Sequence, residues 1–448
     1  MSTYQRPEQS FSIELRTALH MGSGDPEGGS DAGVVRDFNG LPGLPGPGIQ
    51  GLLRSTCLEH PACGADASER LDFVERVFGY TGGNGRKPSD GKTDDPGRGG
   101  RVWVGWGVIH NQNNKPQSDW IRETELKRDP VLADAVRSVL RDQVKISARG
   151  AADDKAKFDQ IVVNPGHRFT FTIKFATAPN DQKAQQSDWQ TDWQTLLTVL
   201  RDPALRLGGK TRRGLGGFKI ITEGYAQHAE SKLFTRLLDR PIAPASLWMF
   251  GGGKAIDDGT KQPDSVPVSC RRIDWSGTTG IPRPVWLIPG TGIKGPLVHR
   301  TLFHANLKKG IFIGETAPPG AEEEVNRWMC QLFGGVKGNT STIGKIVIDD
   351  HFLDQEGHHK VPSAPTQMHV KINPFTGGAS DKALFSDQPL QAKAAMIPLR
   401  IEVRGQVDPD ALACFESALD DLDQGRLALG AHSSRGYGRF KKGTKELL

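Results

Sequence analysis

The segment Leu44-Pro45-Gly46-Pro47-Gly48-Ile49-Gln50-Gly51 decides how this chain of 448 residues is organised, because it returns in the second half. The later copy reads Ile288-Pro289-Gly290-Thr291-Gly292-Ile293-Lys294-Gly295, and both copies share the pattern P-G-x-G-I-x-G. Each copy leads into an apolar stretch that can open a helix. An internal repeat of this kind predicts two homologous units in one chain.

Strand and helix patterns follow each copy in the same order. Residues 168–175, RFTFTIKF, and 397–404, IPLRIEVR, alternate polar and apolar side chains, which is typical of half-buried strands. Apolar residues at helical spacing come next in both halves: Trp193, Leu196, Leu197 and Leu200, then Leu412, Phe415, Leu419 and Leu422.

A glycine-rich loop closes each half, at residues 207–218, LGGKTRRGLGGF, and 429–440, LGAHSSRGYGRF. Strand, helix, loop and strand in this order predict an α+β fold: two tandem ferredoxin-like domains with glycine-rich loops and hairpin insertions. We expect the first domain at residues 1–224, a linker at 225–243 and the second domain at 244–448.

Composition limits the classes of function. The 57 Lys and Arg against 52 Asp and Glu give a net charge of +5, so any nucleic-acid site must be a local basic patch. No stretch approaches the ~18 apolar residues of a membrane span. Five cysteines are an odd number, which argues against a disulfide framework. We therefore expect a cytoplasmic protein with no membrane partner.

The glycine loops and the repeated segment favour anion binding. A backbone without side chains can approach a phosphate while nearby cations neutralise it, and a helix N-terminus attracts anions. The repeated segment lacks the ending of a P-loop, so a mononucleotide site is disfavoured. The alternative is a tight turn with solvated charges. The predicted phosphate contacts are Lys210, Arg212, Arg213, Arg435, Arg439, Gly46, Gly48, Gly51, Gly290, Gly292, Lys294 and Gly295.

These motifs resemble the RAMP (repeat-associated mysterious protein) superfamily and, within it, the backbone subunits of type III CRISPR interference complexes. Met21-Gly22-Ser23-Gly24, then residues 31–37 and Gly40-Leu41-Pro42, precede the first repeated segment, and Ser434-Arg435-Gly436-Tyr437-Gly438 closes the second half. The resemblance covers nearly the whole chain as two fused copies. It implies RNA-recognition-motif-like domains that bind CRISPR guide RNA, with complementary target RNA and other CRISPR effector subunits as partners.

The resemblance also implies that an aspartate before the glycine segment cuts target RNA. That residue is Asp31 in the first half and Asp264 in the second, with Asp257 and Asp258 left open as alternatives. A carboxylate can hold a hydrated Mg²⁺ (or Mn²⁺) at the scissile phosphate and favour attack by the neighbouring 2′-hydroxyl. The chain is thus predicted to be a metal-dependent endoribonuclease within a complex; a non-catalytic guide-RNA scaffold is the alternative.

Two further residue patterns bear on metals and catalysis. Cys57, His60 and Cys63 have C-x₂-H-x₂-C spacing, which predicts a structural Zn²⁺ site, against the alternative of ordinary surface residues. His20 allows a comparison with RAMP nucleases that process CRISPR RNA by acid–base catalysis without a metal. Its place in the first strand makes that function the less favoured alternative.

Overall fold

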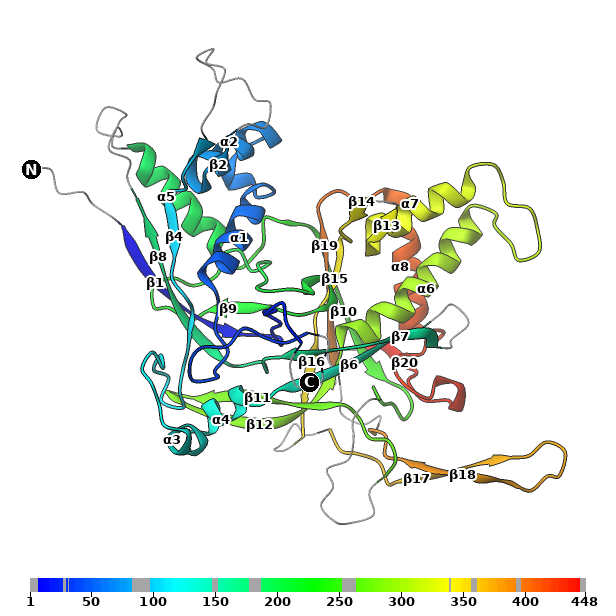
Figure 1. Cartoon of the computed structure of the whole chain (residues 1–448). Helices are drawn as coiled ribbons and strands as arrows, with labels where there is room; N and C mark the ends of the chain where they lie inside the picture. Colours follow the sequence, from blue (N-terminus) through cyan, green and yellow to red (C-terminus); the bar gives the residue numbers. More distant parts are fainter. Residues whose placement is uncertain are drawn as a thin grey trace, which may run out of the picture.

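The computed structural model of the chain is shown in Figure 1, with the first half in blue to green and the second in green to red. The residues that the structure describes are 7–26, 30, 32–82, 97–146, 152–176, 187–251, 263–337, 340–355, 361–391 and 396–443. Each half contains one antiparallel sheet with helices packed against it.

The sheet of the first half has the order β4-β8-β1-β9. Its strands are β1 (Glu8–Leu15), β4 (Val102–Val104), β8 (Arg168–Phe175) and β9 (Phe218–Ile220), and β5 (Val108–Ile109) also pairs with β8. Alternate residues of β8 are buried, as the sequence pattern predicts. The helices α1 (Gly46–Cys57), α2 (Ala67–Phe78) and α5 (Ser187–Leu200) share its apolar core.

The sheet of the second half repeats this topology as β15-β19-β10-β20. Its strands are β10 (Phe234–Pro244), β15 (Ile346–Ile348), β19 (Ile397–Arg404) and β20 (Phe440–Lys442), and its helices are α6 (Gly290–Lys308), α7 (Ala321–Phe333) and α8 (Pro409–Asp423). In both sheets the second, third, first and fourth strands lie side by side, which is the ferredoxin-like order. The prediction of two tandem ferredoxin-like domains is confirmed.

The equivalence of the halves extends to single hydrogen bonds in the glycine loops. The amide of Gly209 donates to the His20 carbonyl over 2.8 Å, and the amide of Ala431 donates to the Met249 carbonyl over 2.7 Å. Each loop contains a short 3₁₀ turn, η3 (Thr211–Arg213) and η4 (Ser433–Arg435), preceded by a residue with φ near +60°. These matches fix a residue-by-residue alignment of the two loops.

The range 225–243 that we expected to be a linker contains most of β10. Leu238 and Ile242 in this strand are buried in the core of the second half, although Pro241 interrupts the apolar alternation that would reveal a strand. The first strand of the second sheet therefore begins before residue 244, which corrects the expected linker.

The insertions form additional sheets. In the first half, the chain from β5 to β8 contains two helices and a hairpin: α3 (Glu123–Arg128), α4 (Pro130–Val136) and β6 (Val139–Ile146)–β7 (Ala152–Val162). In the second, the hairpin β17 (Gln367–Ile372)–β18 (Ala379–Asp387) projects from the molecule (Figure 1). The shorter pieces are η1 (Pro61–Cys63), β2 (Tyr80–Thr81), β3 (Gly97–Arg98), β13 (Gly335–Lys337) and β14 (Thr340–Thr342), and a further sheet contains β11 (Ser269–Ser276), β12 (Thr279–Ile288) and β16 (His351–Asp354).

The two halves contact each other directly. The Trp275 indole donates to the Gly166 carbonyl over 2.8 Å, and the Ile273 amide donates to the Pro165 carbonyl over 3.0 Å. The turn η3 of the first half packs against β15 of the second. None of the helices that the structure describes has the length and apolar character needed to span a bilayer.

Candidate nucleic-acid interface

The repeated segment forms the start of a helix in both halves. Proline precedes the first helical residue of α1 and of α6 and occupies the first turn of α1, where its missing N–H costs no hydrogen bond. Gly46 and Gly290 are buried, and a Cβ there would lie 2.0 Å from the Val104 carbonyl oxygen or 2.3 Å from that of Ile348. These two predicted phosphate contacts are therefore close-packing positions between helix and strand.

Gly48 and Gly51, the next two glycines of the repeated segment, are exposed on α1. Ser55, one turn later, lies on the same face, so the three residues form a stripe of the helix without bulky side chains. A Cβ on Gly51 would meet no atom within 4 Å, so the backbone here is accessible rather than tightly packed. Gly292 and Gly295 hold the corresponding positions on α6; both are half-buried, and a Cβ on Gly292 would lie 2.8 Å from the Phe250 ring while Gly295 has open space. An exposed helix stripe without bulky side chains allows a ribose–phosphate backbone to come close.

A surface pocket of about 390 Å³ lies where the stripe of α1 meets the glycine loop of the first half. Its lining contains Met21, Gly48, Gly51, Leu52, Ser55, Arg206, Gly208, Gly209 and Thr211. Two motifs that are far apart in the sequence therefore form the walls of one concave surface. The second half repeats the helix and the loop but not their surface, because Phe250 lies against Gly292 and His299 stands where α1 has Ser55.

Of the predicted cations, Lys210, Arg435 and Arg439 are exposed around these loops, and Arg213 is half-buried. Arg213 lies over the Phe158 ring at 4.7 Å, and Arg435 lies over the Phe385 ring at 4.4 Å. Stacking on an aromatic ring restricts a guanidinium without using up its donors. These arginines are thus held near the loops in an orientation that can still bind phosphate.

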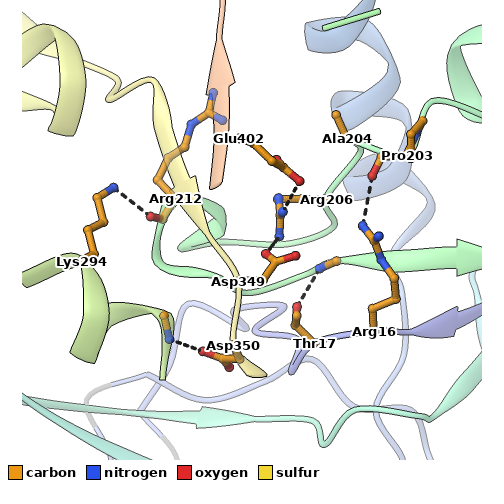
Figure 2. A network of polar contacts seen from close by, with 12 residues as sticks. Arg16, Thr17, Pro203, Ala204, Arg206, Arg212, Lys294, Asp349, Asp350 and Glu402 are labelled. Atoms are coloured by element: carbon orange, nitrogen blue, oxygen red, sulfur yellow. Dashed lines mark hydrogen bonds and ion pairs between the residues drawn. The ribbon is translucent and has the colours of Figure 1, made fainter. Parts of the chain in front are cut away.

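Arg212 and Lys294 occupy a different environment, the junction between the halves (Figure 2). The Lys294 ammonium donates to the carbonyls of Arg212, over 3.1 Å, and Ile346, over 2.9 Å. Burial, with the charges of Arg212 and Arg213, lowers the pKa of Lys294 to about 8. Burial, with the charge of Arg404, lowers the pKa of Arg212 to about 10. The Lys294 side chain therefore joins the halves through the main chain of Arg212, and the Arg212 guanidinium lies largely buried beside this contact.

Arg206 is the centre of that junction, and sequence reasoning missed it. Its side chain is only 1% exposed and forms ion pairs with Asp349 and, over 2.9 Å, with Glu402 (Figure 2). Arg404 donates to Glu402 over 3.0 Å and to the Ala204 carbonyl over 2.5 Å. A charged residue between two apolar ones, Leu205 and Leu207, was the available signal for a buried ion pair.

The junction carries more positive than negative groups. Among the described residues, the cations Arg16, Arg206, Arg212, Lys294 and Arg404 face the carboxylates of Asp349 and Glu402, and Asp350 lies nearby, paired with Arg141. Arg206 also lines the pocket beside α1, so the junction borders that pocket.

Of the predicted catalytic aspartates and their alternatives, the structure describes Asp264 alone. Asp31, Asp257 and Asp258 lie outside the described residues. Asp264 is exposed, and its Oδ2 accepts hydrogen bonds from the Ser386 amide, over 2.7 Å, and from the Ser386 hydroxyl, over 3.1 Å. The carboxylate is therefore held at the base of the β17–β18 hairpin.

Backbone hydrogen bonds support the pairing of Asp31 with Asp264. The Ile161 amide donates to the Ala32 carbonyl over 3.0 Å, and the Gln388 amide donates to the Ser265 carbonyl over 3.0 Å. Both donors lie at the end of an inserted hairpin, and both acceptors directly follow the aspartate in question. Ala32 and Ser265 therefore make corresponding contacts in the two halves.

The predicted zinc ligands do not converge. The Cys57 and Cys63 side chains are buried together, and the hydrogen bond between them, with burial, raises the pKa of Cys57. His60 instead places Nε2 3.4 Å from Asp202, while its Nδ1 accepts from the Ala62 amide over 3.1 Å. Within the described ranges, no three His, Cys, Asp or Glu side chains are arranged to hold a metal ion.

His20, the residue compared with processing nucleases, is buried in the irregular segment that follows β1, which ends at Leu15, so the expectation that it lies inside the first strand is wrong. Its Nδ1 lies 2.8 Å from the Ile161 carbonyl oxygen. A Cβ on Gly208 would lie 2.2 Å from the His20 carbonyl oxygen, so this segment supports the glycine loop. The observed role of His20 is to pack and position the loop.

Comparison with known proteins agrees with this architecture. The family model of the RAMP superfamily matches residues 12–219 and 271–441, one region in each half. No curated protein gives a significant match. RAMP proteins bind CRISPR RNA and act in multisubunit complexes, and some members cleave RNA. With one matched region on each ferredoxin-like domain, the chain belongs to the RAMP superfamily.

Proposed function

We propose that the chain is a guide-RNA-binding backbone subunit of a type III CRISPR interference complex and that it cuts target RNA. The observation that carries the binding proposal is the pocket in which the bare stripe of α1 meets the glycine loop. Single-stranded RNA is held through backbone charge and close approach, and this surface provides both.

Two variants test the RNA surface separately from the fold. Gly51→Leu adds a side chain where a Cβ would meet no neighbour within 4 Å, so the protein should fold while the pocket becomes obstructed. RNA affinity should fall, whereas Ser68→Leu on the exposed part of α2 should leave it unchanged. Equal affinities for both variants, measured by fluorescence anisotropy, would contradict the proposed surface.

Arg435→Ala tests the charge contribution. Removing one phosphate contact should reduce the salt dependence of binding, the slope of log K against log salt, by about 0.7 for single-stranded RNA. Arg327→Ala is the control, since this exposed arginine of α7 pairs with Glu324 and Asp408. An unchanged slope for Arg435→Ala would remove Arg435 from the interface.

The cleavage proposal rests on Asp31 and Asp264. Asp264 fits a divalent ion because it is exposed and its hydrogen bonds within the described chain fall on Oδ2. Mg²⁺ commonly takes one or two carboxylates and completes its shell with water and phosphate oxygens. Mg²⁺ or Mn²⁺ bound there would polarise the scissile phosphate. Ser386 would keep the carboxylate in place for that task.

The assembled complex with end-labelled target RNA distinguishes a nuclease from a scaffold. Asp31→Ala and Asp264→Ala should each remove a different cut while guide binding persists, because the two hairpins lie at different points along the chain. A chelator should stop both cuts. Complete absence of cutting by the wild-type complex would favour the non-catalytic scaffold, and cutting in the presence of chelator would refute the metal mechanism.

A further inference from the structure

The second half contains a cluster of ionisable groups around Asp387, a fully buried residue of β18. His369 of β17 places Nε2 3.0 Å from the Asp387 carboxylate, and His432 of the glycine loop places Nε2 3.6 Å from it. Arg435 approaches the same oxygen at 3.7 Å. Tyr437 donates its hydroxyl to the other oxygen over 3.2 Å. One carboxylate thus holds two imidazoles.

Among the described residues, several buried polar atoms of this cluster lack a well-aligned hydrogen bond. The Nε2 atoms of His369 and His432 and the Oδ2 atom of Asp387 are buried, yet none makes an aligned hydrogen bond within the described part of the chain. Buried polar atoms are normally satisfied, so unaligned ones call for an explanation. The two imidazoles are each about a quarter exposed, so an external ligand can reach them.

The first half has no such cluster at the corresponding place. Gln143 pairs with Phe158 as His369 pairs with Phe385, and the arginine of each loop lies over that phenylalanine. The first half therefore has Gln143, Gln160, Lys210 and Leu215 at the positions of His369, Asp387, His432 and Tyr437. Of the ionisable residues in the cluster, only the arginine is kept, as Arg213 in the first half and Arg435 in the second.

Lys210 and His432 have the same backbone conformation, with φ of 57° and 59°, and each directly precedes the 3₁₀ turn of its loop. The same backbone conformation places a permanent cation in one loop and a titratable group in the other. Burial, followed by the charge of Arg435, lowers the pKa of His432. Since Arg435 and Asp387 carry opposite charges, each proton that the cluster gains on an imidazole adds one positive charge.

We propose that His369 and His432, seated on Asp387, bind a phosphodiester group of RNA in their protonated form. In the structure Arg435 Nη1 lies 3.0 Å from His432 Nδ1, a hydrogen bond that protonation of this nitrogen would break. The guanidinium and the protonated imidazole would then both turn to the phosphate oxygens beside His369, while Asp387 keeps the two imidazoles close together despite their like charge. RNA binding by the second half then takes up protons, whereas binding by the first half does not. This inference rests on the proposed RNA-binding function.

The test measures binding of a single-stranded oligouridylate to the full chain at pH 8 and pH 6 and constant ionic strength. Wild-type affinity should rise as the pH falls, by at most about tenfold per pH unit for each proton taken up. The variant H369Q/H432K carries the first half's residues and should lose this rise, while its affinity at pH 8 should equal or exceed that of wild type. His304→Gln, from the His304–Asp421 pair joining α6 and α8, is the matched control and should keep the rise.

Calorimetry in two buffers of different ionisation enthalpy provides a second readout that needs no variant. Binding of the oligouridylate to wild type near neutral pH should show net proton uptake. An H369Q/H432K variant with the wild-type pH dependence, or binding without proton uptake, overturns the inference while leaving RNA binding itself intact. Failure of wild type to bind the RNA at either pH would instead refute the proposed function.

Discussion

Replacing Arg206 with Ala should strongly weaken the junction between the two halves. The guanidinium is almost fully buried, and its loss leaves the carboxylates of Asp349 and Glu402 without their main counter-charge. Removing one partner of a buried ion pair typically costs about 3–5 kcal/mol. Arg404 still pairs with Glu402 over 3.0 Å, so we expect the lower end of this range, about 3 kcal/mol.

The cost can be measured by urea unfolding followed by tryptophan fluorescence, comparing Arg206→Ala with Arg272→Ala. The latter removes an exposed pair with Asp354 at 3.3 Å and should cost less than about 1 kcal/mol. The double variant R206A/E402Q should lose less than the sum of the two single variants, because the buried acid is then neutral. Equal losses for Arg206→Ala and Arg272→Ala would refute the account of the junction.

The pH dependence of the same pair gives an independent check. Burial alone would raise the pKa of Asp349, but the charge of Arg206 outweighs it and lowers the pKa. A carboxylate with a lowered pKa stabilises the folded chain above its usual pKa, and this contribution disappears as the pH falls through the lowered value. The acid loss of stability should therefore be smaller in Arg206→Ala than in wild type.

Three further predictions concern single positions. Gly214→Ala should lower the melting temperature of the chain more than Gly436→Ala does. Both glycines have φ near +87°, but a Cβ at Gly214 would lie 2.7 Å from a carbonyl oxygen of β15, whereas Gly436 has open space. Equal losses in thermal melts would contradict this reasoning. Lys294→Met should abolish part of the gain in stability toward urea between pH 8 and pH 10, because the folded chain loses the Lys294 proton near pH 8 while the unfolded chain retains it. The Cys57 and Cys63 thiols should react slowly with iodoacetamide at pH 8 until urea unfolds the chain. Both thiols are buried, and the raised pKa of Cys57 suppresses its thiolate form. Equal reaction rates in the folded and unfolded chain would contradict the burial of these thiols.

The fold could be predicted from sequence because its signals are local and occur twice. Glycines at fixed spacing, alternation in β8 and β19, and helical spacing in α5 and α8 each depend on neighbouring residues, and the repeat made the order of elements visible. The strand β10 was missed because proline interrupts its alternation, so that pairing with β19 and β20 decides its structure. Tertiary pairing thus overrode a weak local pattern.

The site was predicted in part for the same reason. The glycine motifs led to loops in which Lys210, Arg435 and Arg439 are exposed, while their contact with RNA and the catalytic role of Asp31 and Asp264 stay predictions. The spacing of Cys57, His60 and Cys63 could not reveal that Asp202, far along the chain, would attract the imidazole instead. The Asp387 cluster was equally hidden, because its members come from β17, β18 and the glycine loop and meet only in the folded chain.

Equivalent positions in a repeated chain need not keep equivalent roles, because their surroundings differ. Arg212 of the first loop is mostly buried, and its carbonyl accepts from Lys294 of the second half, whereas Ser434, at the same loop position, is exposed. The first loop therefore stabilises the junction between the halves through the residue next to Arg213. In the second loop, His432 and Arg435 instead approach Asp387 of the β17–β18 hairpin. The two loops thus share one backbone conformation but pack against different parts of the second half, which is why we propose proton-linked binding for the second loop alone.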